Sequence, residues 1–154
     1  MRQHQNIHQG YDDPCQRFFN ALGKNSYIRP HRHSIDPKTE DLFAIRGLFA
    51  LIAFDNTGAV AQVIKFGTEQ YLEACKAEAV GVELAAGTWH TVLALTQEAV
   101  LLEMKAGPFD PLAAKEPAPW SPEEGSAEAS AYLAQLHHCV STWCVPSGAP
   151  AFAE

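Results

Sequence analysis

The sequence predicts an all-β domain, a small antiparallel barrel or sandwich flanked by a short N-terminal helix and a C-terminal helix. Short apolar runs separated by turn residues follow one another between residues 26 and 105. This spacing is typical of sandwiches and barrels rather than of alternating strand–helix units. The chain has 154 residues, of which 47% are hydrophobic and 19% are charged. These values predict one globular domain with a substantial core.

The N-terminal segment, residues 1–25, is expected to contain one short helix. Asp13 offers an acidic cap and Pro14 suits the first helical turn. Several apolar residues follow, and Gly23 is a suitable terminator. These signals predict a helix over residues 13–22.

The barrel is expected to occupy residues 26–108. The strand-like runs are residues 27–33, 41–54, 59–66, 79–84, 91–95 and 100–105. Gly47 is expected to divide the second run into two strands. The polar turn at residues 55–58 lies between two apolar runs, which predicts a hairpin.

Residues 109–154 are expected to form a proline-rich segment, a helix and a loose tail. Prolines recur through residues 108–122, a pattern that favours extended and irregular backbone. Ser121 as a cap and Pro122 at the first helical position predict a helix that continues to about Cys139. The last residues, from Pro146 onward, are rich in Pro, Gly and Ala.

The net charge and the hydropathy of the chain argue against two classes of protein, nucleic-acid-binding proteins and membrane proteins. Eighteen acidic and eleven basic side chains give a formal charge of −7, which argues against a nucleic-acid-binding protein. No apolar run approaches the ~18 residues of a membrane-spanning helix, and the N-terminus lacks the apolar stretch of a secretory signal. We therefore expect a cytoplasmic protein without a membrane partner.

Four cysteines are expected to be free thiols in a reducing compartment. Cys139 and Cys144 lie near two histidines and raise the question of a second metal site. Their spacing lacks the CxxC form typical of zinc sites. We favour a helix end followed by a tail.

Four residues of metal-binding type form the strongest pattern. Alternate side chains of a strand share a face, so His31 and His33 are expected to point the same way. A turn can fold the next strand back and bring Glu40 beside them. His90 begins a later strand and can join them only where the sheet closes on itself. Imidazole and carboxylate together suit one divalent transition metal, either Fe, Mn, Zn, Ni, Cu or Co.

This pattern resembles the two sequence motifs of the cupin superfamily. The first motif, HxH followed by Glu and Gly, is matched by His31, His33, Glu40 and Gly47. Residues 85–90, AAGTWH, resemble the second motif, PxGxxH, with alanine in place of the proline. The Asn that often follows the second motif is also replaced, by Ala94.

More narrowly, the chain resembles WbuC-type cupin proteins over roughly residues 5–135. The matching segments are residues 6–8, 26–33, 38–40, 87–91, 103–108 and 118–123. The resemblance implies a small antiparallel, jelly-roll-like barrel that holds one metal through three His and one Glu. Some WbuC-type proteins are associated with surface-polysaccharide gene clusters, which implies a sugar or nucleotide-sugar ligand.

Two further residues share the strand parity of the predicted ligands. Tyr27 and Arg29 are therefore expected to face the interior with His31. Tyr27 is a candidate for proton transfer, with core packing as the favoured alternative. Arg29 either clamps a substrate carboxylate or phosphate or pairs with an interior carboxylate such as Glu103.

Glu103 and Lys105 share one face of the last predicted strand. They form either an interior acid/base pair close to the metal or a solvated strand edge. Arg32 and Lys38 lie near the expected mouth of the barrel. Both are candidate substrate-binding residues, with solvated surface cations as the alternative.

These features leave more than one class of function open. The first is a metal-dependent enzyme, either an isomerase or epimerase, a lyase or an oxygenase, that acts on a small polar metabolite. The second is a non-catalytic, metal-dependent binding or sensing protein, and the third is a metal-free structural barrel. By analogy with cupins we expect a homodimer, formed through residues 48–54 or the N-terminal segment.

Overall fold

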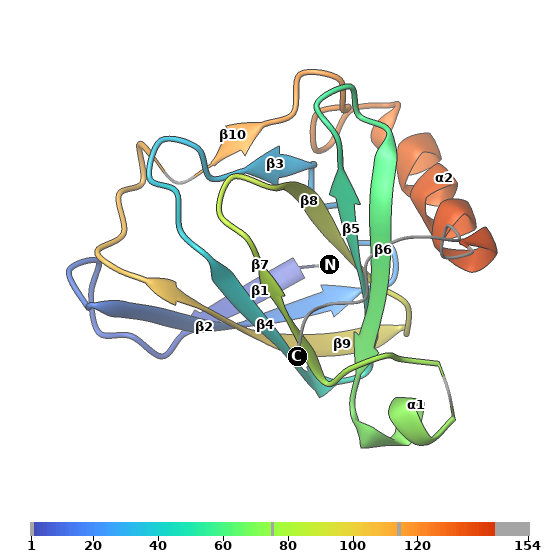
Figure 1. Ribbon diagram of the computed structural model, residues 1–154, viewed down its shortest axis with the longest axis horizontal. Coiled ribbons are helices and arrows are strands. Elements are labelled where there is room, and N and C mark those ends of the chain that lie inside the picture. Colours follow the sequence, from blue (N-terminus) through green and yellow to red (C-terminus); the bar gives the residue numbers. More distant parts are fainter. Residues whose placement is uncertain (1, 75, 114, 144–154) are drawn as a thin grey trace.

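A computed structural model describes residues 2–74, 76–113 and 115–143, and it consists mainly of two five-stranded antiparallel sheets (Figure 1). The first sheet contains, in spatial order, β1 (Arg2–Asn6), β2 (Cys15–Gly23), β9 (Glu98–Ala106), β4 (Glu40–Arg46) and β7 (Gly81–Leu84). The second sheet contains β10 (Glu116–Pro117), β3 (His31–Arg32), β8 (Trp89–Ala94), β5 (Leu48–Phe54) and β6 (Val60–Gly67). The predicted all-β class is confirmed.

A hydrophobic core lies between the two sheets. Its centre is the stacked pair Phe49 and Phe66, whose rings lie 5.2 Å apart and are fully buried. Leu42 and Leu101 contribute to the same core from the first sheet, and Val92 from the second. The sequence predicts a closed barrel, but the two sheets are not closed into a single barrel. The inward side chains converge because the sheets face each other.

The predicted N-terminal helix is wrong, because residues 15–23 form strand β2. Every residue of this strand is in register with β9, and residues 18–22 also pair with β1. Pairing on both edges outweighs the local cap-like signals at Asp13 and Pro14. The first sheet therefore begins well before residue 26, where the sequence placed the start of the barrel.

The turns that divide the central strands are as predicted. Gly47 separates β4 from β5 and has a φ of 87°, a left-handed conformation that favours glycine. The Asp55–Gly58 turn connects β5 and β6 in a hairpin. The carboxylate of Asp55 accepts hydrogen bonds from the backbone N–H groups of Thr57 and Ala59, so this side chain fixes the turn.

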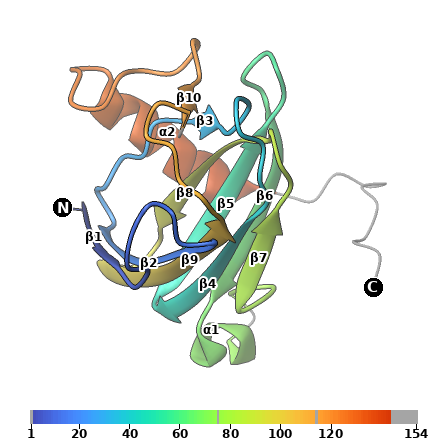
Figure 2. The ribbon, with the colours of Figure 1, turned by 90° about the vertical axis from the view of Figure 1, so that its left-hand side faces the viewer.

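Helix α2 (Ala129–Thr142) packs on the outer face of the second sheet (Figures 1 and 2). Leu133, Leu136 and Val140 of the helix share a buried cluster with residues of β5. Residues 48–54 are consequently covered by the helix on one side and by the core on the other. The expectation that this run forms a dimer surface is wrong.

The C-terminal helix starts later than the sequence suggested. Ser121 donates its hydroxyl hydrogen bond to the carbonyl of Ala118 instead of capping a helix. Gly125 has a φ of 82°, which is incompatible with a continuous helix, and α2 begins only after it. A second short helix, α1 (Glu69–Glu73), follows β6 and was not predicted. The expected loose tail lies outside the described residues.

Two of the four cysteines are described, and both are free thiols. Cys15 is exposed and Cys139 is partly buried. Cys144, the other member of the suggested second metal site, lies outside the described residues. None of the helices in the described ranges combines the length and hydropathy needed to cross a membrane.

Candidate metal centre and its cavity

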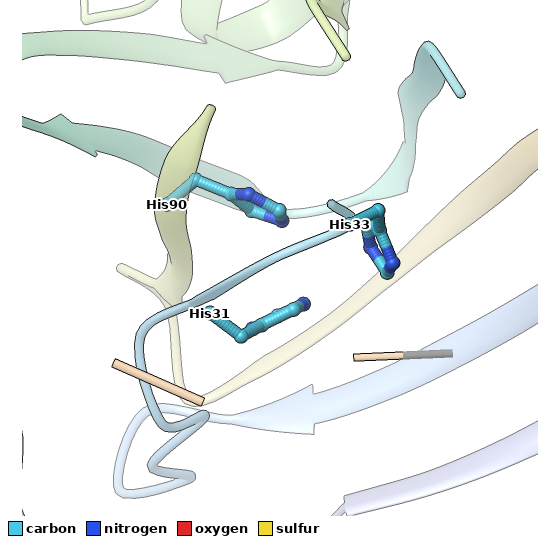
Figure 3. Close-up of side chains that lie close together, drawn as sticks. All are labelled: His31, His33 and His90. Carbon is cyan, nitrogen blue, oxygen red and sulfur yellow. The ribbon is translucent and has the colours of Figure 1, made fainter. Parts of the chain in front are cut away.

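Three buried histidines gather between the two sheets. His31 of β3 and His90 of β8 are direct cross-strand neighbours, and their ring centroids are 4.4 Å apart. His33 follows β3, and its ring lies 5.3 Å from that of His31 and 5.9 Å from that of His90. One ring nitrogen from each residue lies within 4.8 Å of the others. Figure 3 shows the three imidazoles extending toward a common space.

Glu40 approaches the histidines from the first sheet, at the start of β4. Its carboxylate oxygens lie 3.0 Å from Nε2 of His33 and 3.5 Å from Nε2 of His90. The side chain of Glu40 is buried. The structure thus brings together all four residues that the sequence assigned to a metal.

Backbone carbonyls fix the orientation of two of the imidazoles. Nδ1 of His31 is 2.9 Å from the carbonyl oxygen of Arg29, and Nδ1 of His90 is 2.9 Å from that of Thr88. A proton on Nδ1 then leaves the Nε2 lone pair available as a ligand. This arrangement is the usual support of a metal-binding histidine, and the sequence could not reveal it.

The electrostatics of the cluster also fit a cation. Burial lowers the pKa of His31 well below its ordinary value, so this imidazole is neutral and its nitrogen is free to coordinate. For Glu40, burial acts to raise the pKa, but hydrogen bonds from His33 and His90 and the charge of Lys105 lower it well below the usual range. Imidazole nitrogens beside a carboxylate are a donor set that suits divalent transition metals.

Lys105 and Glu103 continue the polar network away from the histidines. Nζ of Lys105 donates to Glu40 at 2.8 Å and to Glu103 at 3.2 Å. Asn20 of β2 donates to the other oxygen of Glu103 at 3.0 Å. Both charged residues lie on β9, which is a central strand rather than an edge. Of the two alternatives left by the sequence, the interior position is the one observed.

The charges of this pair are strongly affected by their surroundings. Burial and the neighbouring charge of Glu40 raise the pKa of Glu103. For Lys105, burial acts to lower the pKa, but Glu40 and Glu103 together raise it above its ordinary value. Lys105 therefore carries a positive charge, and Glu103 holds a proton more readily than an exposed carboxylate does.

A cavity of about 330 Å³ opens in front of these groups. It is lined by His31, Glu40 and His90 together with Glu103 and Lys105. Its apolar wall consists of Phe18, Ile28, Leu42, Val92, Leu101 and Phe109. The volume is near the lower end of the ~300–1,000 Å³ range of small-molecule sites.

Several residues of this cavity were not expected from the sequence. Phe18 and Asn20 had been assigned to a helix, although alternation along a strand would have placed both on one face. Arg2 and His4 of β1 also line the cavity, in an N-terminal segment for which no strand was predicted. Lys115 also lines the cavity and had no recognisable motif around it.

Tyr27 and Arg29 do not face the cavity with His31. Strand β3 contains only two residues, so the side-chain alternation expected from residue 27 to residue 33 does not hold. The hydroxyl of Tyr27 donates to the carbonyl of Pro122 at 2.9 Å. The guanidinium of Arg29 donates to the hydroxyl of Ser121 and the carbonyl of Ala118, each at 3.2 Å. The shared interior face was therefore a wrong prediction.

Replacing Tyr27 with phenylalanine is expected to change stability mainly at alkaline pH. Burial raises the pKa of Tyr27 to about 12 from an ordinary value of 10. Because the folded state favours the protonated phenol, Tyr27 contributes fully to the free energy of unfolding below pH 10. This contribution is lost as the pH rises from 10 through 12. Urea denaturation should show a shallower alkaline decline for Tyr27→Phe and a loss of about 1 kcal/mol at neutral pH. If Tyr27→Phe lost stability at alkaline pH as steeply as the wild type, the raised pKa of Tyr27 would be contradicted. Tyr11→Phe, at an exposed position, is the control.

Arg32 and Lys38 hold parts of the backbone together. Arg32 donates two hydrogen bonds to Glu116 of β10, at 2.8 and 2.9 Å, and lies 4.3 Å from the centre of the Trp89 ring. Lys38 contacts Asp36 at 2.6 Å and the carbonyl of Pro108 at 2.7 Å. Neither residue lines the cavity with His31 and His90, although Lys38 lines a separate small pocket with His33 and Lys105.

Comparisons with known proteins place this geometry in context. A family model described as "Domain of unknown function (DUF6016)" matches residues 1–66, which is less than half of the chain. No curated protein matches the sequence. The likeness that covers most of the chain is one of structure.

Several solved structures share the fold over most of the chain. A Shewanella oneidensis protein has a TM-score of 0.59 at 10% identity, covering 90% of this chain and 83% of its own. A cupin 2 domain-containing protein from Halorhodospira halophila has a TM-score of 0.51 at 12% identity, with 94% and 84% covered. KdgF from a Halomonas species has a TM-score of 0.52 at 11% identity, with 72% and 83% covered. The chain has a cupin fold.

The chain spans only part of the length of two other similar structures. The chain spans 52% of an HTH_3 family transcriptional regulator from Vibrio cholerae, at a TM-score of 0.50 and 15% identity, with 70% of this chain covered. It spans 26% of an oxalate decarboxylase from Lactobacillus farciminis. At these identities the likeness extends to the fold alone. In this cupin fold, the histidine cluster lies where the two sheets face each other.

Proposed function

We propose that the protein is a metal-dependent enzyme that acts on a small polar metabolite. The observation that carries this proposal is the position of two charged groups in the metal cavity. Glu103 and Lys105 line the same cavity as His31, Glu40 and His90. An enzyme needs titratable groups close to the reacting atoms, whereas a pure binding protein does not.

The chain's own residues would divide the work as follows. His31, His33, His90 and Glu40 would hold the divalent metal, which supplies a Lewis acid when bound. Glu103, whose pKa is raised by burial, would hold or transfer a proton within the cavity. Proton transfer of this kind suits isomerisation, epimerisation or elimination better than oxygenation.

The finer identity follows from the sequence resemblance. We infer a WbuC-type protein whose substrate is a sugar or nucleotide sugar of surface-polysaccharide synthesis. The cavity of about 330 Å³ supports a substrate portion of monosaccharide size. We further propose that the protein is cytoplasmic, acts without nucleic acid or membrane partners and forms a homodimer.

The test compares the wild type with Glu103→Gln and with Glu98→Gln. Glu98 lies on the same strand, but its side chain is 75% exposed and pairs with Arg46 at the surface. Each protein is incubated with a panel of sugars and sugar derivatives, and products are followed by NMR. We expect turnover by the wild type and Glu98→Gln, its loss on chelation, and a loss of about 10²-fold or more in Glu103→Gln.

Metal content is measured on the same samples. Glu103→Gln should retain the metal, since this residue is not one of the candidate ligands. Ligand binding without conversion in the wild type would favour the non-catalytic binding or sensing function instead. Turnover that resists chelation would contradict the proposal.

A further inference from the structure

Lys115 is a cavity residue whose position is set by its neighbours. It directly precedes β10, which pairs with β3 beside the histidine cluster. The adjacent residue, Glu116, accepts two hydrogen bonds from Arg32 and one from the hydroxyl of Ser34. Arg32 lies against the ring of Trp89. These contacts fix the backbone that presents Lys115 to the cavity.

The three cations that line the cavity differ in their partners. The ammonium of Lys105 is bonded to two carboxylates, those of Glu40 and Glu103. Arg2 is held at the rim by two hydrogen bonds to Glu124. Lys115 makes no hydrogen bond or ion pair with any residue of the described ranges. It is therefore the cation that remains available to a ligand.

The charged groups of the cavity, together with a bound divalent metal, would give it a net positive charge. When Glu103 is ionised, the carboxylates of Glu40 and Glu103 balance the ammonium groups of Lys105 and Lys115, and when Glu103 holds a proton the cavity gains one further positive charge. A divalent metal on the histidines would then leave an excess of at least two positive charges. Buried charge of one sign is costly unless it is compensated, so the complete site favours an anionic occupant.

We propose that the metabolite carries an oxyanion, either a carboxylate or a phosphate, and that Lys115 binds this group while the rest of the molecule faces the metal. This inference rests on the proposed function and adds the substrate class and its recognition residue. Arg32, which the sequence suggested as a substrate-binding residue, is a positioning residue that anchors β10 and so places Lys115.

The environment of Lys115 supports this assignment. Lys115 is exposed at the open side of the cavity, but the atoms packed around its ammonium desolvate it and lower its pKa, and the positive charge of Lys105 acts in the same direction. The carboxylate of Glu103 acts against this but makes no direct bond to Lys115. An oxyanion in contact with the ammonium would offset its desolvation.

The experiment measures binding of matched probes by isothermal titration calorimetry. The anionic probes are succinate, D-glucuronate, inorganic phosphate and D-glucose 6-phosphate, and the neutral probes are succinamide and D-glucose. The protein is loaded with the metal that the purified chain retains. The variants are Lys115→Met, Lys115→Arg and, as control, Lys24→Met at an exposed position.

We expect at least one anionic probe to bind the wild type at least tenfold more tightly than its neutral counterpart. Lys115→Met should weaken this binding by about 10- to 100-fold, because a hydrogen bond to a charged group is lost. Lys115→Arg should restore much of it, and Lys24→Met should bind as the wild type does. A preference for glucuronate or for the phosphates identifies the oxyanion.

Three results would overturn the inference: equal binding of neutral and anionic probes, no binding of any anion, or unchanged affinity in Lys115→Met. Metal analysis of the same samples separates the two proposals. A wild type that holds its metal but shows no anion preference overturns this inference alone. A wild type that takes up no metal overturns the proposed function and, with it, this inference.

Discussion

Replacing His90 with alanine is expected to abolish retention of the metal. His90 supplies one of the clustered ring nitrogens and is held in place by the carbonyl of Thr88. Changes to the groups that merely orient a ligand cost about 10–100-fold in metal affinity. Removal of the ligand itself should exceed this, and His31→Ala should behave alike. Mass-spectrometric metal analysis after desalting measures the effect.

Two further variants make this prediction specific. His138 lies exposed on α2, so His138→Ala should keep the metal content of the wild type. His90→Gln preserves most of the side-chain volume and a polar end, which protects against loss of metal through misfolding. A folded His90→Gln or His90→Ala protein with wild-type metal content would show that the four residues do not form the site.

The gathering of His31, His33, Glu40 and His90 could be predicted because most of its signals are local in the sequence. His31 and His33 are separated by one residue, and Glu40 follows after one turn. Only the position of His90 beside the other three residues depends on the fold, and the resemblance to the second cupin motif predicted that position. The structure gives the physical reason, since His31 and His90 are paired across neighbouring strands.

The remaining cavity could not be predicted because it depends on long-range pairing. Residues 13–22 carry cap-like signals, yet pairing of β2 with both β1 and β9 makes them a strand. This error hid the inward positions of Phe18 and Asn20. Lys115 reaches the cavity through the pairing of a two-residue strand with β3, which leaves no periodic pattern in the sequence.

Phe49→Ala is expected to destabilise the protein by about 3–5 kcal/mol, the typical cost of emptying a buried phenylalanine site. Phe49 is fully buried and stacks on Phe66 at 5.2 Å, between the two sheets that carry the site. Domains of this kind have unfolding free energies of about 5–15 kcal/mol, so the loss is a large fraction of the total. Urea denaturation gives the value. Ile45→Ala, at a half-exposed position on β4, should change the free energy of unfolding by about 0.5 kcal/mol or less.

The hydrophobic core and the cavity beside the histidines have side chains in common. Leu42, Val92 and Leu101 belong to the hydrophobic core and also line the cavity. A metal that binds the folded state should therefore restore part of the stability of Phe49→Ala, by about 2.7 kcal/mol at 100 times its dissociation constant. Failure of the metal to raise the stability of folded Phe49→Ala would mean that the core no longer holds the two sheets at the distance the histidines and Glu40 require. A loss below about 1 kcal/mol would instead mean that the space left by Phe49 collapses without strain.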